Sequence, residues 1–341
     1  MKQYLLPEQG QFYKANLHCH STVSDGRLTP QELKELYMRH GYSIIAYTDH
    51  EVMIPHQELT DDTFLALHAH ELSFSNGMKG KDCRVCHLCM IGLEPDNVRQ
   101  VCWHRSKYIC GNAKNYMDQV TFDESAPDYE RVYSVEGINE VIDIARKAGF
   151  FVTYNHPVWS LEDPEQYMKY KGFHAMEIYN HGCVVEGYDD YVPQIFDAML
   201  RKGNRIFCVA TDDNHNRHAE GSPFFDSLGG FTMIKADRLD YRSVTRAMEA
   251  GHFYASTGPL IHELWYEDGS VHIKCSPAAK IVANYGMIRA KVVYAEGTPL
   301  TEASFPVKPD SLYFRLTVTD EKGDVAHTNA YFIDDLPKEQ A

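Results

Sequence analysis

Residues 17–26 read Leu17-His18-Cys19-His20-Ser21-Thr22-Val23-Ser24-Asp25-Gly26. In an extended backbone, side chains alternate between two faces, so His18 and His20 point the same way while Cys19 points the other way. Both imidazoles can then reach one metal ion, and Asp25, in a Ser-Asp-Gly turn, can fold its carboxylate back toward it. A single His-x-His pair is weak evidence, since two solvated or hydrogen-bonded histidines also explain it. More telling is the recurrence of similar polar clusters, each after an apolar run.

A repeating unit of helix, glycine, strand and polar cluster organises the first part of the chain. Thr29-Pro30-Gln31-Glu32 is a capping box that predicts a helix ending at Gly41, followed by a strand over 42–47 and the cluster Thr48-Asp49-His50. The unit returns with helices that end at Gly149, Gly203 and Gly251, strands over 150–154, 205–210 and 252–256, and the clusters Asn155-His156-Pro157 and Thr211-Asp212-Asp213-Asn214-His215.

This rhythm predicts an α/β fold with parallel strands. Further strand-like runs lead into His18, Glu71 and His181 and cover 84–91, so the count is about seven over some 260 residues. That number favours a closed or nearly closed barrel over an open sheet. Sites in such folds assemble at the carboxyl ends of the strands, where most of the His, Asp and Glu clusters fall.

The pattern changes after residue 260. We predict a barrel domain over 1–260 and, over 261–341, a small antiparallel β module with alternating strands and turns at Asp268-Gly269 and Lys322-Gly323. Residues 94–135 interrupt the barrel pattern, and we expect them to form a lid or a substrate-selecting insertion.

Composition narrows the function classes. The 341 residues carry a formal charge of −15, which opposes binding to long nucleic acids or anionic membranes but permits a small phosphorylated substrate beside metal ions. No apolar run approaches the length of a membrane span, and residues 1–8 lack the apolar core of a signal peptide. Nine cysteines, an odd number, fit reduced thiols, so we expect a cytoplasmic protein. The oligomeric state stays open.

Nine side chains are candidate metal ligands. Imidazole and carboxylate groups together suit Mn, Fe or Zn, and nine groups match two or three ions. Taken singly, each is more often a solvated or hydrogen-bonded polar residue, but their joint position at strand ends favours a metal centre. They are His18, His20, Asp25, His50, Glu71, His87, His156, Asp213 and His215.

Other polar residues near these clusters are candidates for substrate contact. Asn180 and His181 end a strand-like run, and His181 could protonate a leaving group, with a polar barrel-rim residue as the alternative. Arg27, Arg217 and His218 could bind phosphate, with surface solvation as the alternative. Asp49 and Asp212 are expected to orient imidazoles.

A second metal site is conceivable in Cys83-x-x-Cys86-His87-x-Cys89, which imitates a zinc knuckle. In a strand, however, His87 and Cys89 share one face while Cys86 faces the other, so one ion would have difficulty collecting all three. The sequence contains no Gly-x-Gly-x-x-Gly or Walker motif and no Gly-x-Ser-x-Gly elbow.

The motifs, in order, resemble those of the PHP (polymerase and histidinol phosphatase) metallohydrolases. They are Leu17-His18-Cys19-His20-Ser21 with Ser24-Asp25-Gly26, Thr48-Asp49-His50, Glu71, His87-Leu88, Asn155-His156-Pro157 and Asp213-Asn214-His215. Ala255-Ser256-Thr257-Gly258-Pro259, Tyr313-Phe314-Arg315 and Ala326-His327-Thr328-Asn329 are more similar to the carbaryl-hydrolase-like branch, which has a C-terminal β appendage.

The resemblance implies a distorted (β/α)7 barrel with three metals. His18, His20, Glu71 and Asp213 would hold the first ion; Glu71, His87 and His156 the second; Asp25, His50 and His215 the third. Many PHP proteins have His where this chain has Asp25, which makes the third site the least secure. The resemblance implies catalysis by a hydroxide that bridges the first two ions. The predicted catalytic set is His18, His20, Glu71 and Asp213, together with His181 as the candidate acid from its position at a strand end.

The function predicted from the sequence is therefore metal-dependent hydrolysis of a small phosphomonoester or a cyclic or simple phosphodiester. One alternative is a carbamate or carboxylic ester hydrolase on the same metals, because the resembling branch includes one. Another is a non-catalytic phosphate-binding protein. Fold and metal site alone do not choose between the two enzymes.

Overall fold

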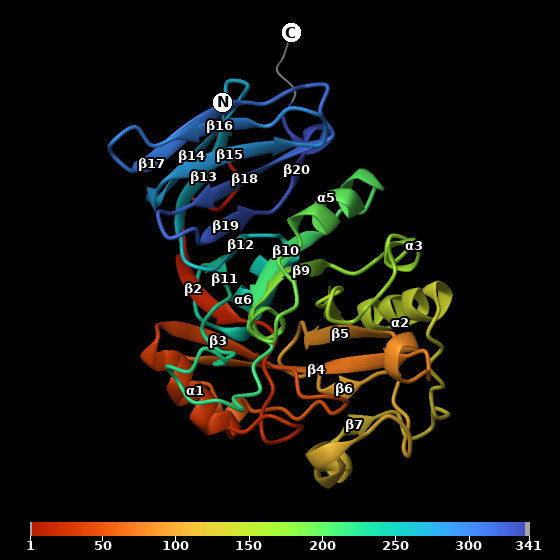
Figure 1. The fold of residues 1–341 in the computed structure, drawn as a ribbon. Coiled ribbons are helices and arrows are strands. Elements are labelled where there is room, and N and C mark those ends of the chain that lie inside the picture. Colours follow the sequence, from red (N-terminus) through yellow and green to blue (C-terminus); the bar gives the residue numbers. More distant parts are fainter. Residues whose placement is uncertain (1, 338–341) are drawn as a thin grey trace.

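The computed structural model describes residues 2–337, so the outer ends of the two predicted domains, residue 1 and residues 338–341, lie outside it. The fold is mixed α/β, built on one large sheet that is rich in parallel strands (Figure 1). Two parallel groups form its first part: β2 (Gln11–Asn16), β3 (Tyr42–Tyr47) and β4 (Leu65–Ser75), and β8 (Phe150–Tyr154), β9 (Ala175–Asn180) and β10 (Phe207–Thr211).

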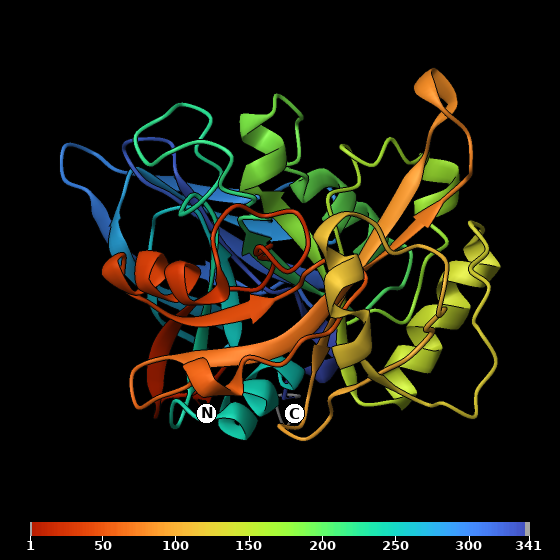
Figure 2. The same cartoon turned by 90° about the horizontal axis from the view of Figure 1, so that it is seen from below.

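The prediction of uniformly parallel strands is wrong at two places. β5 (Val85–Gly92) joins the two groups and runs antiparallel to both β4 and β8. The connection from β4 to β5 is a short hairpin, and a short hairpin joins antiparallel neighbours only. Its tip projects from the body of the molecule (Figure 2). On the other side of β2, β11 (Phe231–Ala236) and β12 (Phe253–Ser256) are also antiparallel, and β11 was not predicted.

The sheet curls, which brings its end strand β10 against two strands from the middle of the sheet. β10 contacts β11 and β12. Thr232 Oγ1 lies 3.1 Å from the Ala210 carbonyl oxygen, to which it can donate, and it can also accept from the Ala210 amide. Within residues 2–337 no backbone ladder joins β10 to β11, so side chains rather than main-chain pairing bridge this seam.

Four helices pack against strands of the large sheet: α1 (Pro30–Arg39) against β3, α2 (Val135–Lys147) against β8, α5 (Pro193–Arg201) against β9 and α6 (Tyr241–Glu249) against β11. The Thr29 capping box is confirmed, with Thr29 Oγ1 accepting from the Glu32 amide at the start of α1. Each long helix buries an apolar stripe against the strands, as the periodicity predicts, for example Ile138, Val141 and Ile142 in α2. The helices are α1 (Pro30–Arg39), α2 (Val135–Lys147), α3 (Pro164–Tyr167), α4 (His181–Val185), α5 (Pro193–Arg201) and α6 (Tyr241–Glu249).

The strands after residue 260 are antiparallel, as predicted, but they divide between two sheets. β13 (Ile261–Glu267), β14 (Ser270–Ala278) and β17 (Leu300–Pro306) form one sheet, whose edge strand is β1 (Gln3–Tyr4). The others continue the large sheet beyond β12: β19 (Val325–Thr328), β18 (Tyr313–Thr319), β15 (Lys280–Tyr285) and β16 (Lys291–Tyr294), with β20 (Tyr331–Phe332) beside β18. The division at residue 260 stays a prediction.

Residues 94–135 carry β6 (Arg99–Gln100), β7 (Thr121–Phe122) and a 3₁₀ segment, Gly111–Gln119. Their apolar side chains, including Trp103 and Val120, pack against Val23 and Val52 in the loops after β2 and β3. None of the described helices is both long enough and apolar enough to cross a membrane.

Candidate metal centre

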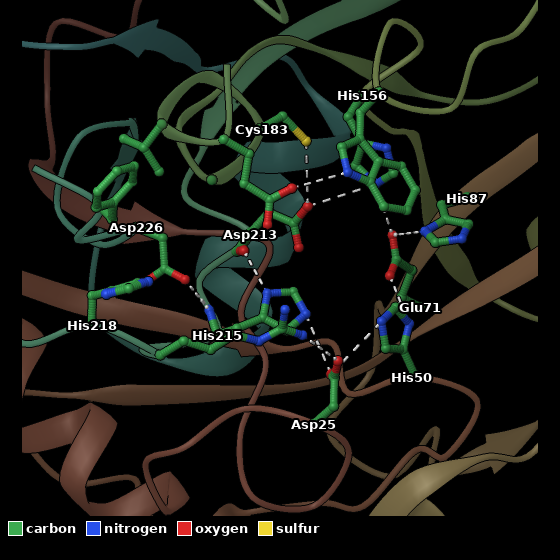
Figure 3. A pocket seen from close by; sticks show the side chains of 16 residues that line it. Asp25, His50, Glu71, His87, His156, Cys183, Asp213, His215, His218 and Asp226 are labelled. Carbon is green, nitrogen blue, oxygen red and sulfur yellow. Dashed lines mark hydrogen bonds and ion pairs between the residues drawn. The ribbon is translucent and has the colours of Figure 1, made fainter. Parts of the chain in front are cut away.

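The structure brings all nine candidate ligands together at one edge of the curled sheet. Figure 3 shows those that line the cavity: Asp25, His50, Glu71, His87, His156, Asp213 and His215. Most of them follow a strand directly, but Glu71 lies within β4, because this strand continues to Ser75. His87 lies near the amino end of β5. Since β5 runs antiparallel, that end is at the same edge as the carboxyl ends of β3 and β8.

Glu71 is the centre of the cluster. Its Oε1 lies 3.2 Å from His18 Nε2, 3.1 Å from His87 Nδ1 and 3.3 Å from His156 Nε2. Its Oε2 lies 2.9 Å from His50 Nδ1 and 3.5 Å from His20 Nε2. Oε2 is buried yet makes no well-formed hydrogen bond. One fully buried carboxylate is thus surrounded by five imidazoles, an arrangement that a divalent cation satisfies better than protons do.

His18, His20 and Asp213 form a second convergence. The two Nε2 atoms lie 3.1 Å apart, and Asp213 Oδ1 lies 3.2 and 3.0 Å from them. Two imidazole nitrogens aimed at each other need a proton or a cation between them.

The third group is more open to solvent. Asp25 Oδ1 lies 3.3 Å from His215 Nε2 and 3.8 Å from His50 Nε2, and His20 completes the set. Among the described residues, His50 therefore belongs both to this group and to a group with Glu71 and His87. The division into three ion sites stays a prediction.

The electrostatics keep the carboxylates charged. Burial favours neutral Glu71, but His87 and His18 hold the pKa of its carboxyl well below the usual range, and His18 and His20 do the same for Asp213. Burial, together with His50 and His215, lowers the pKa of His20 to about 4, so its ring is neutral and offers a lone pair at neutral pH. These donor atoms fit Mn, Fe or Zn.

Sequence reasoning missed Glu177. Its side chain is buried; Oε1 lies 2.7 Å from His18 Nδ1, and Oε2 accepts from the His156 amide. His18 Nδ1 can donate to this carboxylate, which leaves the Nε2 lone pair facing Glu71 and Asp213. The available signal was a single charged residue in the otherwise apolar run of β9.

Asp49 and Asp212 do not orient imidazoles, contrary to expectation. Asp49 accepts hydrogen bonds from the amides and hydroxyls of Ser21 and Ser24, and so holds the loop between His20 and Asp25. Asp212 accepts from the Tyr37 hydroxyl and from the amides of residues 228–230. Both carboxylates stabilise loops that carry the site.

The ligand-bearing loops contain strained backbone. Glu51, His156 and Asp213 have φ values of 68°, 25° and 52°, in the left-handed region that residues other than glycine rarely adopt. Such conformations cost about 1–3 kcal/mol each and cluster at functional sites.

A cavity of about 320 Å³ opens above the cluster. Its walls include residues that the sequence analysis did not single out: Trp159 and Phe224 in loops, and Val185 and Glu186 at the end of α4. The expected phosphate contacts Arg217 and His218 do line it, and Arg217 lies 3.3 Å from Asp25. No residue of the 94–135 insertion lines this cavity.

Three expected substrate contacts lie elsewhere. His181 has both ring nitrogens engaged, Nδ1 with the Tyr179 hydroxyl and Nε2 with the Phe225 carbonyl, so its geometry gives no support to a leaving-group acid. Asn180 is buried, donates to Glu177 and Asp213, and caps α4. Arg27 is exposed and is not part of the cavity lining.

The cysteines of the zinc-knuckle pattern separate as the strand alternation predicts. Cys89 accepts a hydrogen bond from Asn155 beside the cluster, whereas Cys86 lies in the apolar core on the other face of β5. Within residues 2–337 no group of three or more ligand atoms includes Cys83 or Cys86.

Comparison with known proteins finds solved structures that match this chain at low sequence identity. No family model matches the sequence, and no curated protein matches it. A two-domain protein from Bacteroides vulgatus, containing a predicted PHP-like metal-dependent phosphoesterase, is 14% identical, with coverage of 96% of this chain and 98% of that chain and a TM-score of 0.43.

Two further solved structures match over a smaller share of the chain. A candidate metal-dependent phosphoesterase from Bifidobacterium adolescentis is 16% identical, covering 65% of this chain and 94% of its own, with a TM-score of 0.36. An amidohydrolase from Chromobacterium violaceum, with bound sulfate and no metal, is 17% identical, covering 70% and 96%, with a TM-score of 0.40. The solved structures found are thus described as a predicted PHP-like phosphoesterase, a candidate metal-dependent phosphoesterase and an amidohydrolase, at a similarity that leaves function to be argued from the site.

Proposed function

We propose that this chain is a metal-dependent hydrolase of the PHP type, with a distorted (β/α)7 barrel, that cleaves small phosphate esters in the cytoplasm. The observation that supports this most is the position of Glu71, within 3.5 Å of five imidazoles at the floor of a cavity. Such a carboxylate suits a bridge between two cations.

The proposed ligands are the nine predicted residues, and the proposed ions are up to three of Mn, Fe or Zn. When bound, divalent ions supply an activated water and polarise a phosphoryl oxygen. The chain's own part is to hold the donor atoms in place. Glu177 fixes the proton of His18 on Nδ1, and the loops held by Asp49 and Asp212 carry the remaining ligands.

The cavity supports a small substrate. Arg217 and His218 line the cavity next to the cluster, where the guanidinium and the imidazole N–H can donate hydrogen bonds to phosphate oxygens. Trp159 and Phe224 offer flat apolar surface for the leaving group, and about 320 Å³ admits a small molecule. The formal charge of −15 argues against a long nucleic acid as substrate.

The test is release of inorganic phosphate by Mn-reconstituted protein over a panel of small phosphomonoesters and cyclic phosphodiesters. Metal-dependent release supports the phosphoesterase. Silence across the panel, with metal shown to be bound, refutes it and directs attention to carbamate and carboxylic esters. Protein that binds no metal refutes the metal centre itself.

A further inference from the structure

The 94–135 insertion ends in a buried ion pair. Arg131, just before α2, has a side chain only 3% exposed, and Glu51 has one only 4% exposed. Arg131 Nη2 lies 2.7 Å from Glu51 Oε2, and Nη1 lies 2.8 Å from Oε1, so the contact is bidentate. Desolvating two charges is costly, and these close contacts compensate only in part, because Glu51 Oε2 and Arg131 Nε make no well-formed hydrogen bond.

Glu51 directly follows His50. Its φ of 68° is held from several sides. Its amide donates to the Glu71 carbonyl at 2.8 Å, and its carbonyl accepts from Gln100 of the insertion at 2.7 Å. Because this backbone is fixed, so is the direction in which the His50 side chain leaves the end of β3.

The same ion pair reaches His87 through Ser73. Arg131 Nη1 donates to the Ser73 carbonyl at 2.9 Å, and the Ser73 amide donates to Glu51 Oε1 at 3.1 Å. The Ser73 hydroxyl lies 3.1 Å from His87 Nε2, while His87 Nδ1 faces Glu71. Engaging Nε2 in this way sets the ring orientation and leaves Nδ1 for the cluster.

From these contacts we infer that Arg131 is a positioning residue of the metal centre. Acting through Glu51 and Ser73, it sets the geometry of the donor group formed by His50, Glu71 and His87. The insertion then serves as a support for the ligands rather than as a lid over the substrate. This inference rests on the proposed function only in requiring that the centre binds metal, not that the reaction is phosphate release.

The experiment titrates the full chain with Mn²⁺ and records the visible absorption of the Co²⁺-loaded protein. Arg131→Gln should weaken the binding of one metal equivalent by about 10–100-fold, the usual effect of losing a group that orients a ligand, and should alter the Co²⁺ bands. Arg131→Lys should fall between, because an ammonium cannot reproduce the bidentate contact. The matched control is Arg105→Gln, which removes a partly exposed arginine from the same insertion, paired with Asp128, and should leave both readouts unchanged.

Wild-type Mn²⁺ affinity and Co²⁺ bands in folded Arg131→Gln would overturn the inference. If that variant does not fold, Ser73→Ala decides, because it removes a single hydroxyl and should still weaken one equivalent and shift the bands; no change there would equally overturn it. The Glu51→Met/Arg131→Met double variant separates two roles of the ion pair. If the pair only stabilises the fold, replacing both partners by apolar side chains should restore metal affinity fully. If it positions the ligands, metal affinity should stay weakened. Metal binding without phosphate release refutes only the proposed reaction, and equal metal binding by wild type and Arg131→Gln refutes only this inference.

Discussion

Glu71 and Glu162 are both buried glutamates in contact with aromatic or imidazole side chains, yet their surroundings shift the pKa of the two carboxyl groups in opposite directions. Glu71 is enclosed by imidazoles, which hold the pKa of its carboxyl well below the usual range against the effect of burial. Glu162, between β8 and α3, accepts hydrogen bonds from the hydroxyls of Tyr154, Tyr170 and Tyr133. Burial raises its pKa to about 7, because those neutral donors offset the lost solvation only in part.

The difference shows what turns a buried carboxylate into a ligand. Burial acts on both groups, so the sign of the result depends on the neighbours. Imidazoles keep Glu71 charged and can exchange their protons for a cation, and a cavity leads to it. Tyrosine hydroxyls already satisfy Glu162, which therefore serves the packing between α2, β8 and α3.

The largest test of this contrast is the pair Glu71→Gln and Glu162→Gln. We expect Glu71→Gln to lose tightly bound metal and at least about 1,000-fold in turnover, since the central anionic ligand is removed. Glu162→Gln should stay within about threefold of wild type, because outer-face packing does not reach the reacting atoms. Metal equivalents and phosphate release measure both, and similar losses in the two variants would show that the contrast is false.

A pH series tests the raised pKa of Glu162. Between about pH 4.5 and 7, folded Glu162 keeps a proton that the unfolded chain has released, so the free energy of unfolding falls as the pH rises through this window. The expected loss is about 3 kcal/mol and is complete above about pH 7. Urea unfolding of wild type and Glu162→Gln in the presence of a chelator, at pH 5 and pH 8, measures this loss. The same dependence of the free energy of unfolding on pH in both proteins would contradict the raised pKa.

Metal removal tests whether Glu71 is a metal ligand. A cation present at about 100 times its Kd stabilises the folded chain by about 2.7 kcal/mol, and a chelator removes that contribution. The thermal midpoint of wild type should therefore fall on chelation, while that of Glu71→Gln should not move. A chelator-induced shift of the same size in both proteins would place the bound metal elsewhere.

The smallest expected effect is on KM and compares two arginines, Arg217 in the cavity above Glu71 and Arg84 near Glu162. Arg217→Gln should raise KM for a phosphorylated substrate about fivefold and change kcat little, because Arg217 is about half exposed and solvent screens its charge. Arg84→Gln, near Glu162, should leave both constants unchanged. Steady-state kinetics on the two variants test this, and a kcat loss in Arg217→Gln would give this arginine a role in the transition state.

Much of the site could be predicted from the sequence because it follows from local rules. Residues after an apolar strand lie at one edge of a sheet, so His50, His156 and Asp213 could be expected to meet. His87 meets them for a different reason, because it lies near the amino end of β5, and this strand runs in the opposite direction to its neighbours. The direction of β5 could not be predicted, because an apolar run buried on both faces reads the same either way.

The remainder depends on long-range contacts that leave no periodic signal. Glu177 is one polar residue in an apolar strand, and only the fold shows that it faces His18 rather than solvent. The reverse error is possible at His181. A histidine at a strand end resembles a site residue in the sequence even where, as here, a tyrosine hydroxyl and a backbone carbonyl engage both of its ring nitrogens. Trp159 and Phe224 line the cavity from irregular loops, whose positions no spacing rule gives.

The pairing of β1 with β13 bears on how the protein emerges from the ribosome. Gln3–Tyr4 is synthesised long before its partner Ile261–Glu267, and β12 is synthesised before its outer neighbour β19. Until these partners follow, β1 stays unpaired and β12 keeps an open edge in the nascent polypeptide, and both are prone to pair with other chains. The later strands thus protect both sheets from intermolecular association, since β13 pairs with β1 in the smaller sheet and β19 covers the β12 edge of the large sheet.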